Sequence, residues 1–586
     1  MGSIQHGLAR YMGGPVELIE APNGAIVNAE VRQADRYLYR EPTIEEVVDG
    51  VWVCGGYSAA VVYVIEAEDG LIVHDTGDTL EEGHRFRAAI REISDKPVRA
   101  ILYSHSHYAM AGGALVDDPS DVLVVGHPSL NDTVRTNMQG GGAPSLVPEV
   151  APVMTRRLLI QFGNFLPESG PDASTGERIQ IGEADFVPVN RPVANGEVVD
   201  VLGIEMQFFT EFDSDDHNMT VWIPGKGVVL NNFFWPGTPN LYTLRGGEYR
   251  SPLEWRDGLK VIRDLQPDVL LSTHVKPIVG RDEVARRLNG YMDLITLTYD
   301  QTLRGMLLGL GPRDLRYFVH KPPHLAEIPE NLESYGETPH FPEAIYQHII
   351  GWFDGDVTRL YAIPPLEEAE RIVALVGGKD AMVAAVNDAR SRHELAWAAQ
   401  LVQHLHLLEP DDTDIRQLKA DILRELAYRT TGFAPRSFLL SEARQLEGAT
   451  HIPNLVAPAP QVIAASPATF VDYLRIRIDP AKSQDTEAVI GFTFTGDTPT
   501  SVALHIRRGI AEYVDNPDAH YRPIDIAVTM TPECWAGLYV GTTDVRDAIE
   551  TGEVTMTEGE PGTFTNLWAM FDPLPVEARS PAEASR

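Results

Sequence analysis

Two histidines, His105 and His107, follow an apolar run at residues 98–103 and are the first residues whose types and spacing suggest chemistry. In a strand, side chains two residues apart lie on the same face, so both imidazoles can reach one ion where the strand ends. Imidazole binds zinc, iron and copper, and a pair needs one or two further ligands from elsewhere. A His-x-His pair alone more often marks two ordinary histidines at a strand edge, so the metal-binding interpretation depends on the rest of the chain.

Short apolar strands and amphipathic helices alternate on both sides of this pair. Strands are predicted at residues 51–53, 59–66, 70–75 and 122–126, and a helix at residues 81–93. A second β-rich half begins near residue 197 and ends in a strand at residues 269–272, which leads into Thr273 and His274. This alternation predicts α/β layering, with polar residues at the ends of the strands.

The rest of the chain has a different pattern. Long helical periods run from residue 281 to residue 448, which predicts an α-helical domain whose apolar stripes form either an internal core or a dimer surface. A Pro- and Ala-rich linker follows at residues 448–460, and alternating strands and helices then predict a compact α+β domain. Residues 576–586 are expected to be a disordered tail.

The chain is strongly acidic, with 84 acidic and 48 basic residues and a formal net charge of -36. Such a field opposes nucleic acid and anionic membranes, so we expect neither as a partner. Only Cys54 and Cys534 are present, which argues against a disulfide framework and against a structural cysteine–zinc site. The sequence has neither a signal-peptide core nor a membrane-spanning run of about 18 apolar residues, and we expect a cytoplasmic protein.

Several motifs occur in a fixed order along the chain. They are Val73-His74-Asp75-Thr76, His105-x-His107, Arg156-Arg157 with a following Phe-Gly-x-x-Leu-Pro segment, Thr210-Glu211, Asn240-Leu241-Tyr242-Thr243-Leu244-Arg245-Gly246, and Thr273-His274. Together they resemble the metallo-β-lactamase-fold alkylsulfatases, the family that cleaves alkyl sulfate esters such as detergents. The resemblance covers nearly the whole chain, and residues 240–246 are its most specific match.

The resemblance implies a fold and an order of domains. Residues 1–310 would form an α/β metallo-β-lactamase αββα sandwich, residues 311–448 an α-helical dimerisation domain, and residues 449–586 an α+β sterol-carrier-like domain. It also implies a homodimer that acts on a small-molecule substrate of amphiphilic character, without insertion into a membrane.

The family's two-metal motif is incomplete in this chain. The family pattern is His-x-His-x-Asp-His, and its last two positions are occupied here by Ala109 and Met110, which cannot replace the ligands of a second metal ion. The position of a bridging glutamate falls on Asn231 or Asn232, and Pro239 stands where the family has a further histidine. These changes predict an altered site with a single metal ion.

The ligands of the first metal ion are retained. The resemblance assigns His105, His107 and Glu211 to one divalent ion, with zinc expected and iron as the alternative. Two histidines and one carboxylate leave open positions for water or substrate, as in some hydrolytic zinc sites and in non-haem iron sites. His274 would become an outer ligand or a substrate contact, and His274 or Asp75 would handle protons.

The chain contains further donors whose part in the metal shell is open at this stage. They are Asp216 and His217, in an acidic segment that follows Glu211, and the two asparagines Asn231 and Asn232. The acidic segment is equally compatible with a solvated loop.

Two arginines lie five residues apart in the best-matched region. The resemblance assigns the sulfate headgroup to Asn240, Arg245 and Arg250. The planar donor fork of arginine suits sulfate, phosphate and carboxylate equally. In so acidic a chain two such arginines favour anion binding, although surface ion pairs with Glu248 or Glu254 would also account for them.

Three functions are compatible with these residues. The one we favour is a metal-dependent hydrolase that acts on an amphiphilic or small anionic ester at a mononuclear site. The second is a mononuclear non-haem iron enzyme that uses the same ligands for oxidative or rearrangement chemistry. The third is a non-catalytic descendant that binds a ligand, because a fold does not fix a function.

Overall fold

The chain forms two compact units. The computed structural model describes residues 9–140, 147–176, 178–180, 182–214, 216–238, 240–496 and 499–574. The larger unit is built from Met1–Val134 and Leu159–Ile452, and the smaller unit from Arg135–Leu158 and Pro453–Ala584. All the site residues named above belong to the larger unit.

The candidate histidines are positioned by the first of two sheets in the larger unit. This seven-stranded sheet has the order β3 to β9, and β6, β7, β8 and β9 run parallel to one another. Its strands are β3 (Thr43–Val48), β4 (Val51–Gly55), β5 (Val62–Glu66), β6 (Leu71–His74), β7 (Val98–Leu102), β8 (Leu123–Gly126) and β9 (Arg191–Pro192). Every residue of β6 is buried, which explains why its sequence is a continuous apolar run before His74.

The second sheet has six strands in the order β10 to β15, and within it the β13–β14 pair is parallel. Its strands are β10 (Val198–Val201), β11 (Ile204–Phe209), β12 (Thr220–Ile223), β13 (Val228–Asn231), β14 (Val269–Ser272) and β15 (Val275–Val279). The parallel pairs β6–β7 and β13–β14 bring the carboxyl ends of their strands to edges where polar residues follow the strands.

The main core of the larger unit lies between the two sheets. Val53 and Ile65 of the first sheet pack in one cluster with Phe208, Leu230 and Leu271 of the second. Each such buried side chain contributes about 1.5–3 kcal/mol to folding. This face-to-face packing fixes the position of one sheet on the other.

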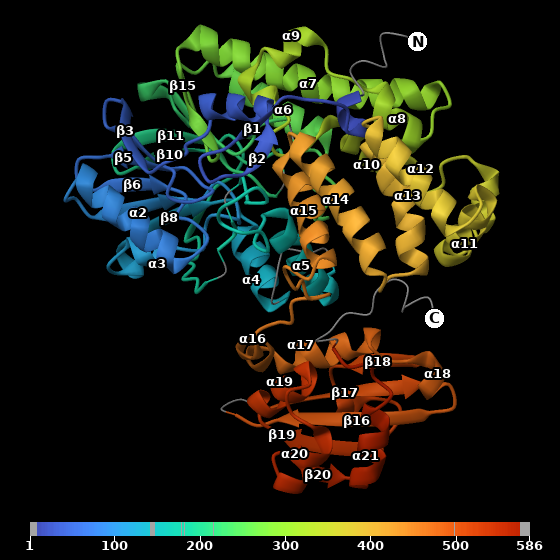
Figure 1. The fold of residues 1–586 in the computed structure, drawn as a ribbon. Helices are drawn as coiled ribbons and strands as arrows, with labels where there is room; N and C mark the ends of the chain where they lie inside the picture. The colour runs from blue at the N-terminus through green and yellow to red at the C-terminus, as the bar shows by residue number, and fades with distance from the viewer. Residues whose placement is uncertain are drawn as a thin grey trace. The chain divides into compact units, whose positions relative to one another are not determined.

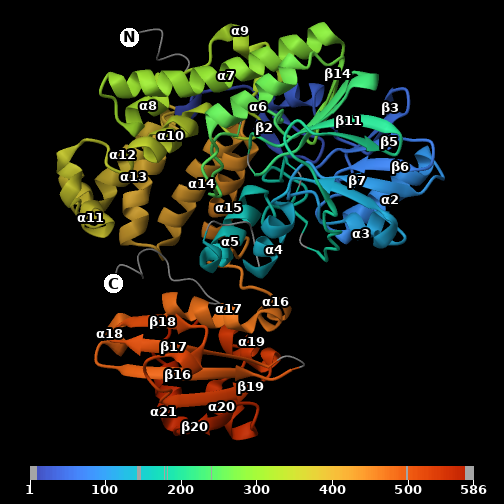
Figure 2. The same cartoon turned by 180° about the vertical axis from the view of Figure 1, so that it is seen from behind.

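Helices cover the outer face of each sheet. α2 (Leu80–Ile93) and α3 (Gly112–Leu115) cover the first sheet, and α6 (Pro252–Asp264) and α7 (Arg281–Leu307) cover the second (Figures 1 and 2). The N-terminus of α2 is capped by the side chain of Thr79, which accepts a hydrogen bond from the backbone of Glu82. The arrangement confirms the predicted αββα sandwich.

The remaining part of the larger unit is mainly helical, as predicted, and it also contains a two-stranded sheet of β1 (Leu18–Glu20) and β2 (Ile26–Asn28). Its helices are α8 (Pro312–Phe318), α9 (Pro323–Ala326), α10 (Phe341–Ile350), α11 (Pro365–Val376), α12 (Lys379–Ser391), α13 (Leu395–Leu408), α14 (Thr413–Arg429) and α15 (Phe433–Leu446). The long helix α7 contacts β14 and β15 as well as α8 and α10, so it joins the sandwich to the helices.

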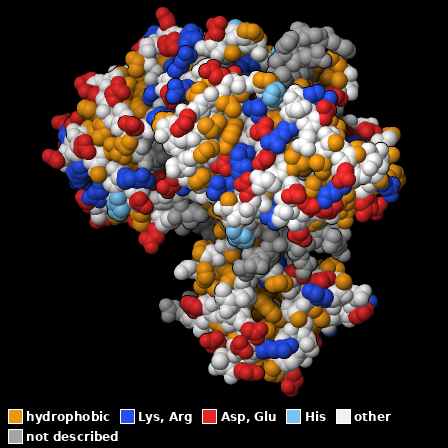
Figure 3. Space-filling view, viewed as in Figure 1, with side chains coloured by type: hydrophobic (Ala, Val, Ile, Leu, Met, Phe, Trp, Pro, Cys, Tyr) orange, Lys and Arg blue, Asp and Glu red, His pale blue; other side chains and the backbone are white. Residues whose placement is uncertain are grey.

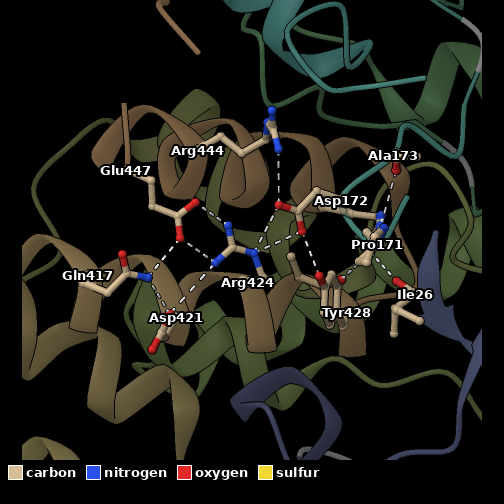
Figure 4. Close-up of polar contacts among 12 residues, drawn as sticks. Ile26, Pro171, Asp172, Ala173, Gln417, Asp421, Arg424, Tyr428, Arg444 and Glu447 are labelled. Carbon is tan, nitrogen blue, oxygen red and sulfur yellow. Dashed lines mark hydrogen bonds and ion pairs between the residues drawn. The ribbon is translucent and has the colours of Figure 1, made fainter. Parts of the chain in front are cut away.

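A polar cluster around Asp172 fixes α14 and α15 to the rest of the larger unit (Figure 4). The Asp172 carboxylate accepts hydrogen bonds from Arg424 Nε (3.0 Å) and Tyr428 Oη (2.7 Å), and Arg444 lies within ion-pair distance. Arg424 also pairs with Glu447 at 2.6 Å. Burial opposes ionisation of Asp172, but the hydrogen bonds from Arg424 and Tyr428 lower its pKa below the ordinary value.

The smaller unit is an α+β domain, as predicted. Its five-stranded sheet has the order β18-β17-β16-β19-β20. The elements are α16 (Pro460–Ala465), α17 (Pro467–Asp472), α18 (Pro480–Ser483), β16 (Glu487–Phe494), β17 (Thr500–Arg507), β18 (Ile510–Val514), β19 (Ile526–Met530), α19 (Pro532–Val540), α20 (Val545–Thr551), β20 (Thr555–Glu558) and α21 (Pro561–Trp568). One apolar cluster, which includes Phe470, Phe492 and Trp535, joins the helices to the sheet.

Several segments differ from the sequence predictions, and two of them have a clear physical reason. The helix expected at residues 469–479 ends at Asp472, and a 3₁₀ turn at Tyr473–Ile476 follows it. The strand β15 contains Pro277 and was not predicted, because proline is tolerated in a strand chiefly at the edge of a sheet, where β15 lies. The tail predicted at residues 576–586 lies outside the described residues.

Acidic and basic side chains are mixed over the face of the molecule seen in Figure 3. Among the described residues, no helix combines the length and apolar character that crossing a membrane would require.

Candidate active site

Asp75 lies where the ends of three strands meet. It follows β6, and its backbone is in the left-handed region with φ of 63°. Its Oδ1 accepts a hydrogen bond from the backbone N–H of Ser104 (2.8 Å), and its Oδ2 accepts from Ser104 Oγ (2.8 Å) and Thr273 Oγ1 (3.2 Å). All three residues are fully buried. Both carboxylate oxygens of Asp75 are therefore engaged by residues that follow β7 and β14.

The same hydrogen bonds orient His105. Ser104 Oγ lies 2.7 Å from His105 Nδ1. An ionised carboxylate can only accept, so the single hydroxyl proton of Ser104 goes to Asp75 and His105 Nδ1 must donate to Ser104. In a neutral imidazole this assignment leaves the lone pair on Nε2, the nitrogen that would bind a cation.

His105 and His107 lie together, as the spacing predicted. Their ring centroids are 4.9 Å apart, and the ring planes meet at 70°. His105 is fully buried, whereas His107 is half-buried. The two imidazoles therefore form one donor pair at the end of β7.

A chain of aromatic contacts joins this pair to His274. The ring of Tyr108 lies edge-on to His105 and to His274, with centroid distances of 5.3 Å to each. The ring of Trp235 also contacts His274, with the ring centroids 4.3 Å apart. His274 Nδ1 lies 3.3 Å from the carbonyl oxygen of Ala59. The structure thus brings His274, at the end of β14, into the neighbourhood of the histidine pair.

Of the predicted anion-binding residues, Arg250 lies next to Trp235. The guanidinium of Arg250 is 5.8 Å from the Trp235 ring, and its Nη1 donates to the carbonyl oxygen of Asn240 (3.0 Å). Arg245 and Arg250 are 8% and 6% exposed, so neither is an ordinary surface arginine. The backbone N–H of Arg245 donates to Gln161 Oε1 (2.9 Å). Two buried guanidinium groups in one short segment are therefore candidates for binding an anion.

Glu211 is not brought together with the histidine pair. It is exposed, and its carboxylate accepts a hydrogen bond from Asn195 Nδ2 at 2.9 Å. Asn231 is occupied elsewhere, because its Oδ1 accepts from the backbone N–H groups of Phe233 and Phe234. The assignment of Glu211 as a ligand therefore stays a prediction, and Asn231 serves the backbone.

The two altered positions after the histidine pair pack into the core. Ala109 is fully buried in an apolar cluster with Phe86 of α2, and the N–H of Met110 donates to the carbonyl oxygen of Gly77. Pro239 lies outside the described residues. In the part of the chain that the structure describes, no group of three or more His, Cys, Asp or Glu side chains could hold a metal ion. The side chains at this site therefore do not fit a centre with two metal ions. For a single ion, they supply two ligands, the imidazoles of His105 and His107.

The acidic segment contacts the histidine loop directly. Ser106 Oγ donates to the carboxylate of Asp216. His217 Nδ1 lies 3.1 Å from Asp213 Oδ2, and this hydrogen bond raises the pKa of His217. The ring of His217 stacks parallel on that of His127 at 4.8 Å, and burial followed by the nearby His217 lowers the pKa of His127. The segment is therefore more than a solvated loop.

Four residues of this region were not predicted: Tyr108, His127, Gln161 and Trp235. His127 has a sequence signal, since it directly follows the strand β8 as His105 follows β7. Tyr108 and Trp235 lie near predicted motifs, but tyrosine and tryptophan are also common in ordinary protein cores, so the sequence does not single them out. Only the packing of distant segments shows their contacts.

Comparisons with protein families agree with this architecture. The family model of the metallo-beta-lactamase superfamily matches residues 55–129, that of alkyl sulfatase dimerisation matches residues 312–449, and that of the alkyl sulfatase C-terminal domain matches residues 457–576. These matches confirm the resemblance inferred from the sequence motifs.

Individual relatives cover most of the chain. A linear primary-alkylsulfatase from Pseudomonas sp. (strain ATCC 19151) is 33% identical over 471 residues, which is 77% of this chain and 87% of the relative. An (R)-specific secondary-alkylsulfatase from Pseudomonas sp. is 28% identical and covers 90% of this chain and 81% of its own length. The structure of the stereoselective inverting sec-alkylsulfatase Pisa1 from Pseudomonas sp. matches with a TM-score of 0.77 and 24% identity, over 98% of this chain and 90% of that chain, which supports the fold.

Proposed function

The chain belongs to the alkylsulfatase family of hydrolases with a metallo-β-lactamase fold, and on this premise we propose that it hydrolyses an amphiphilic or small anionic ester, with an alkyl sulfate ester as the first candidate. One observation supports the proposal most directly. Two arginines that are more than nine-tenths buried, Arg245 and Arg250, lie five residues apart, and Arg250 lies over the ring of Trp235, which contacts His274.

The arginine loop would hold the anionic group of the ester. A buried guanidinium gives charge-assisted hydrogen bonds that are roughly twice as strong as neutral ones. Arg250 is held by the carbonyl oxygen of Asn240 and by the face of Trp235, which fixes its orientation before the substrate binds. Preorganised donors of this kind bind the negative charge that the ester already carries, and little ordering of the loop is then needed when the substrate binds.

His274 would transfer the proton. It lies at the end of β14 between Tyr108 and Trp235, and it is 9% exposed. Proton transfer by a positioned histidine contributes about 10²–10⁴-fold to the rate. Asp75 would act through Ser104 and Thr273, because it holds the loop and the strand end that carry the histidines.

We also propose that the site takes a single divalent ion, with zinc as the first candidate. His105 and His107 would hold it, and the third ligand would be Glu211, which must leave Asn195, or Asp216, which already contacts Ser106. A bound divalent ion would polarise the ester or lower the pKa of a bound water. The apolar packing of Ala109 supports one ion rather than two.

The test is a substrate and metal survey of the purified full chain. We expect release of inorganic sulfate from an alkyl sulfate such as dodecyl sulfate, with about one zinc per chain. One iron per chain together with oxygen consumption would favour the iron alternative. Absence of turnover for sulfate, phosphate and carboxylate esters, with binding retained, would refute the hydrolase proposal and favour a ligand-binding descendant.

A homodimer is the second part of the proposal. Within the segment matched by the dimerisation family, apolar side chains around α10 are exposed, including Trp352 at 71% and Tyr361 at 90%. Exposed apolar groups of this extent mark interaction surfaces. We expect a dimer by light scattering and a monomer for the double variant Trp352→Glu, Tyr361→Glu, whereas Leu307→Glu, an exposed apolar control outside the matched segment, should stay dimeric. A dimer in the double variant would exclude this surface.

A further inference from the structure

We propose that Gln161 is a positioning residue that holds the arginine loop in its anion-binding conformation. The inference rests on the proposed function, because it concerns the loop that would take the anionic group. Gln161 is the last residue of α5 (Ala151–Gln161) and is fully buried. A fully buried glutamine needs partners for its amide, and here those partners belong to the predicted anion site.

The amide oxygen of Gln161 holds the loop at two points. Its Oε1 accepts from the backbone N–H of Arg245 and from Thr243 Oγ1, both at 2.9 Å. A backbone N–H can only donate, so the amide orientation follows from this contact. Thr243 and Arg245 lie in the segment that gave the most specific sequence match, and one buried side chain therefore fixes the backbone on which Arg245 is mounted.

The amide nitrogen of Gln161 joins this loop to the aromatic residues near His274. Its Nε2 donates to Tyr335 Oη at 2.9 Å, and the Tyr335 ring lies 6.1 Å from Trp235. Trp235 in turn contacts both Arg250 and His274. Gln161 thus links the arginine that would bind the anion to the residues that hold the proton-transferring histidine.

Loss of the amide would leave a buried backbone N–H at Arg245 without its partner. Such a group is costly, so the loop would move to satisfy it elsewhere. The expected consequence is weaker anion binding rather than a slower chemical step, because His274 keeps its contacts with Tyr108 and Trp235.

The experiment measures binding of inorganic sulfate, by calorimetry, to the full chain and to three variants. Gln161→Met keeps the length of the side chain and removes the amide, and Tyr335→Phe removes only the hydroxyl that receives Nε2. Asn164→Ala is the matched control, since Asn164 lies in the same segment and its amide donates to the carbonyl oxygen of Ile179. We expect sulfate affinity to fall about ten-fold in Gln161→Met, as for one hydrogen bond of about 1.4 kcal/mol. Tyr335→Phe should lose about three-fold, and Asn164→Ala should match the wild type.

Turnover separates this inference from the proposed function. With an active substrate, Gln161→Met should raise KM and leave kcat nearly unchanged. If the wild-type protein binds sulfate but hydrolyses no ester, the proposed hydrolase function is refuted. The sulfate affinities of the variants then decide the role of Gln161 by themselves. The inference is overturned if the wild type does not bind sulfate, or if folded Gln161→Met and Tyr335→Phe both bind it within two-fold of the wild type. Should Gln161→Met not fold, Tyr335→Phe alone decides by the same criterion.

Discussion

Replacing Asp75 with asparagine should weaken metal binding at His105 without unfolding the protein. Asp75 accepts the hydroxyl proton of Ser104, and this forces His105 Nδ1 to donate to Ser104. An asparagine amide can instead donate to Ser104 Oγ, and the hydroxyl can then donate to Nδ1. The proton of a neutral His105 would move to Nε2, which would leave that nitrogen without a lone pair for the ion.

The size of the effect follows from these contacts. Loss of a partner that orients a metal-binding histidine typically costs 10–100-fold in affinity. The backbone cost should be small, because asparagine tolerates the positive φ of 63° at this position better than most residues. One mispaired buried donor would reduce stability by ~1–3 kcal/mol.

The assay is competition for zinc between the protein and a chromophoric chelator. Asp75→Asn should bind zinc 10–100-fold more weakly than the wild type. Asp69→Asn is the control, since Asp69 is exposed in the turn before β6 and should leave the affinity unchanged. Zinc affinity within two-fold of the wild type in Asp75→Asn would refute the proton assignment at His105.

Three further predictions concern the anion, the third ligand and a buried acid. Arg250→Gln should weaken inorganic sulfate binding by about 10-fold or more in calorimetry, because it removes a charge-assisted donor; an unchanged affinity would exclude Arg250 from the anion site. Of Glu211→Ala and Asp216→Ala, only the variant that removes the third ligand should lower zinc content in a metal analysis, and full zinc in both would exclude both. Burial, and then the adjacent charge of Glu333, raise the pKa of Glu337 to about 7. Because the pKa of Glu337 is higher in the folded state than in the unfolded state, its contribution to the stability of the folded protein is fully present in acid. That contribution is lost as the pH rises through about 7. Glu337→Gln should therefore raise the thermal midpoint more at pH 8 than at pH 5, and an equal shift at both values would contradict this reasoning.

The sandwich could be predicted because its strands and helices have recognisable patterns of apolar residues in the sequence. β6 and β7 are short apolar runs that end in polar residues, and the heptad-like periods of α6 and α7 place one apolar face on a sheet. β15 was not predicted because its five residues include Lys276 and Pro277, and proline is tolerated in a strand chiefly at the edge of a sheet, where β15 lies.

The candidate site was predictable where it depends on strand ends and was not where it depends on packing. His105 and His107 follow β7 of the first sheet, and His274 follows β14 of the second, so the sequence could place each of them at a strand end. Their approach to one another depends on the packing of the two sheets, through Tyr108. Gln161 and Tyr335 are 174 residues apart in the sequence, so no local sequence pattern can predict the hydrogen bond between them. Glu211 illustrates the converse, since a matched motif gives the residue type but not the direction of its carboxylate.

We propose that the buried arginines and the histidines form one hydrolytic site for an anionic ester. Release of inorganic sulfate from dodecyl sulfate by the wild type and by His274→Ala, at matched protein concentration, tests it most directly. We predict repeated turnover by the wild type and a loss of at least ~100-fold in the variant, as for removal of a proton-transferring histidine. Equal rates for the two proteins, or no sulfate released by the wild type, would contradict the claim.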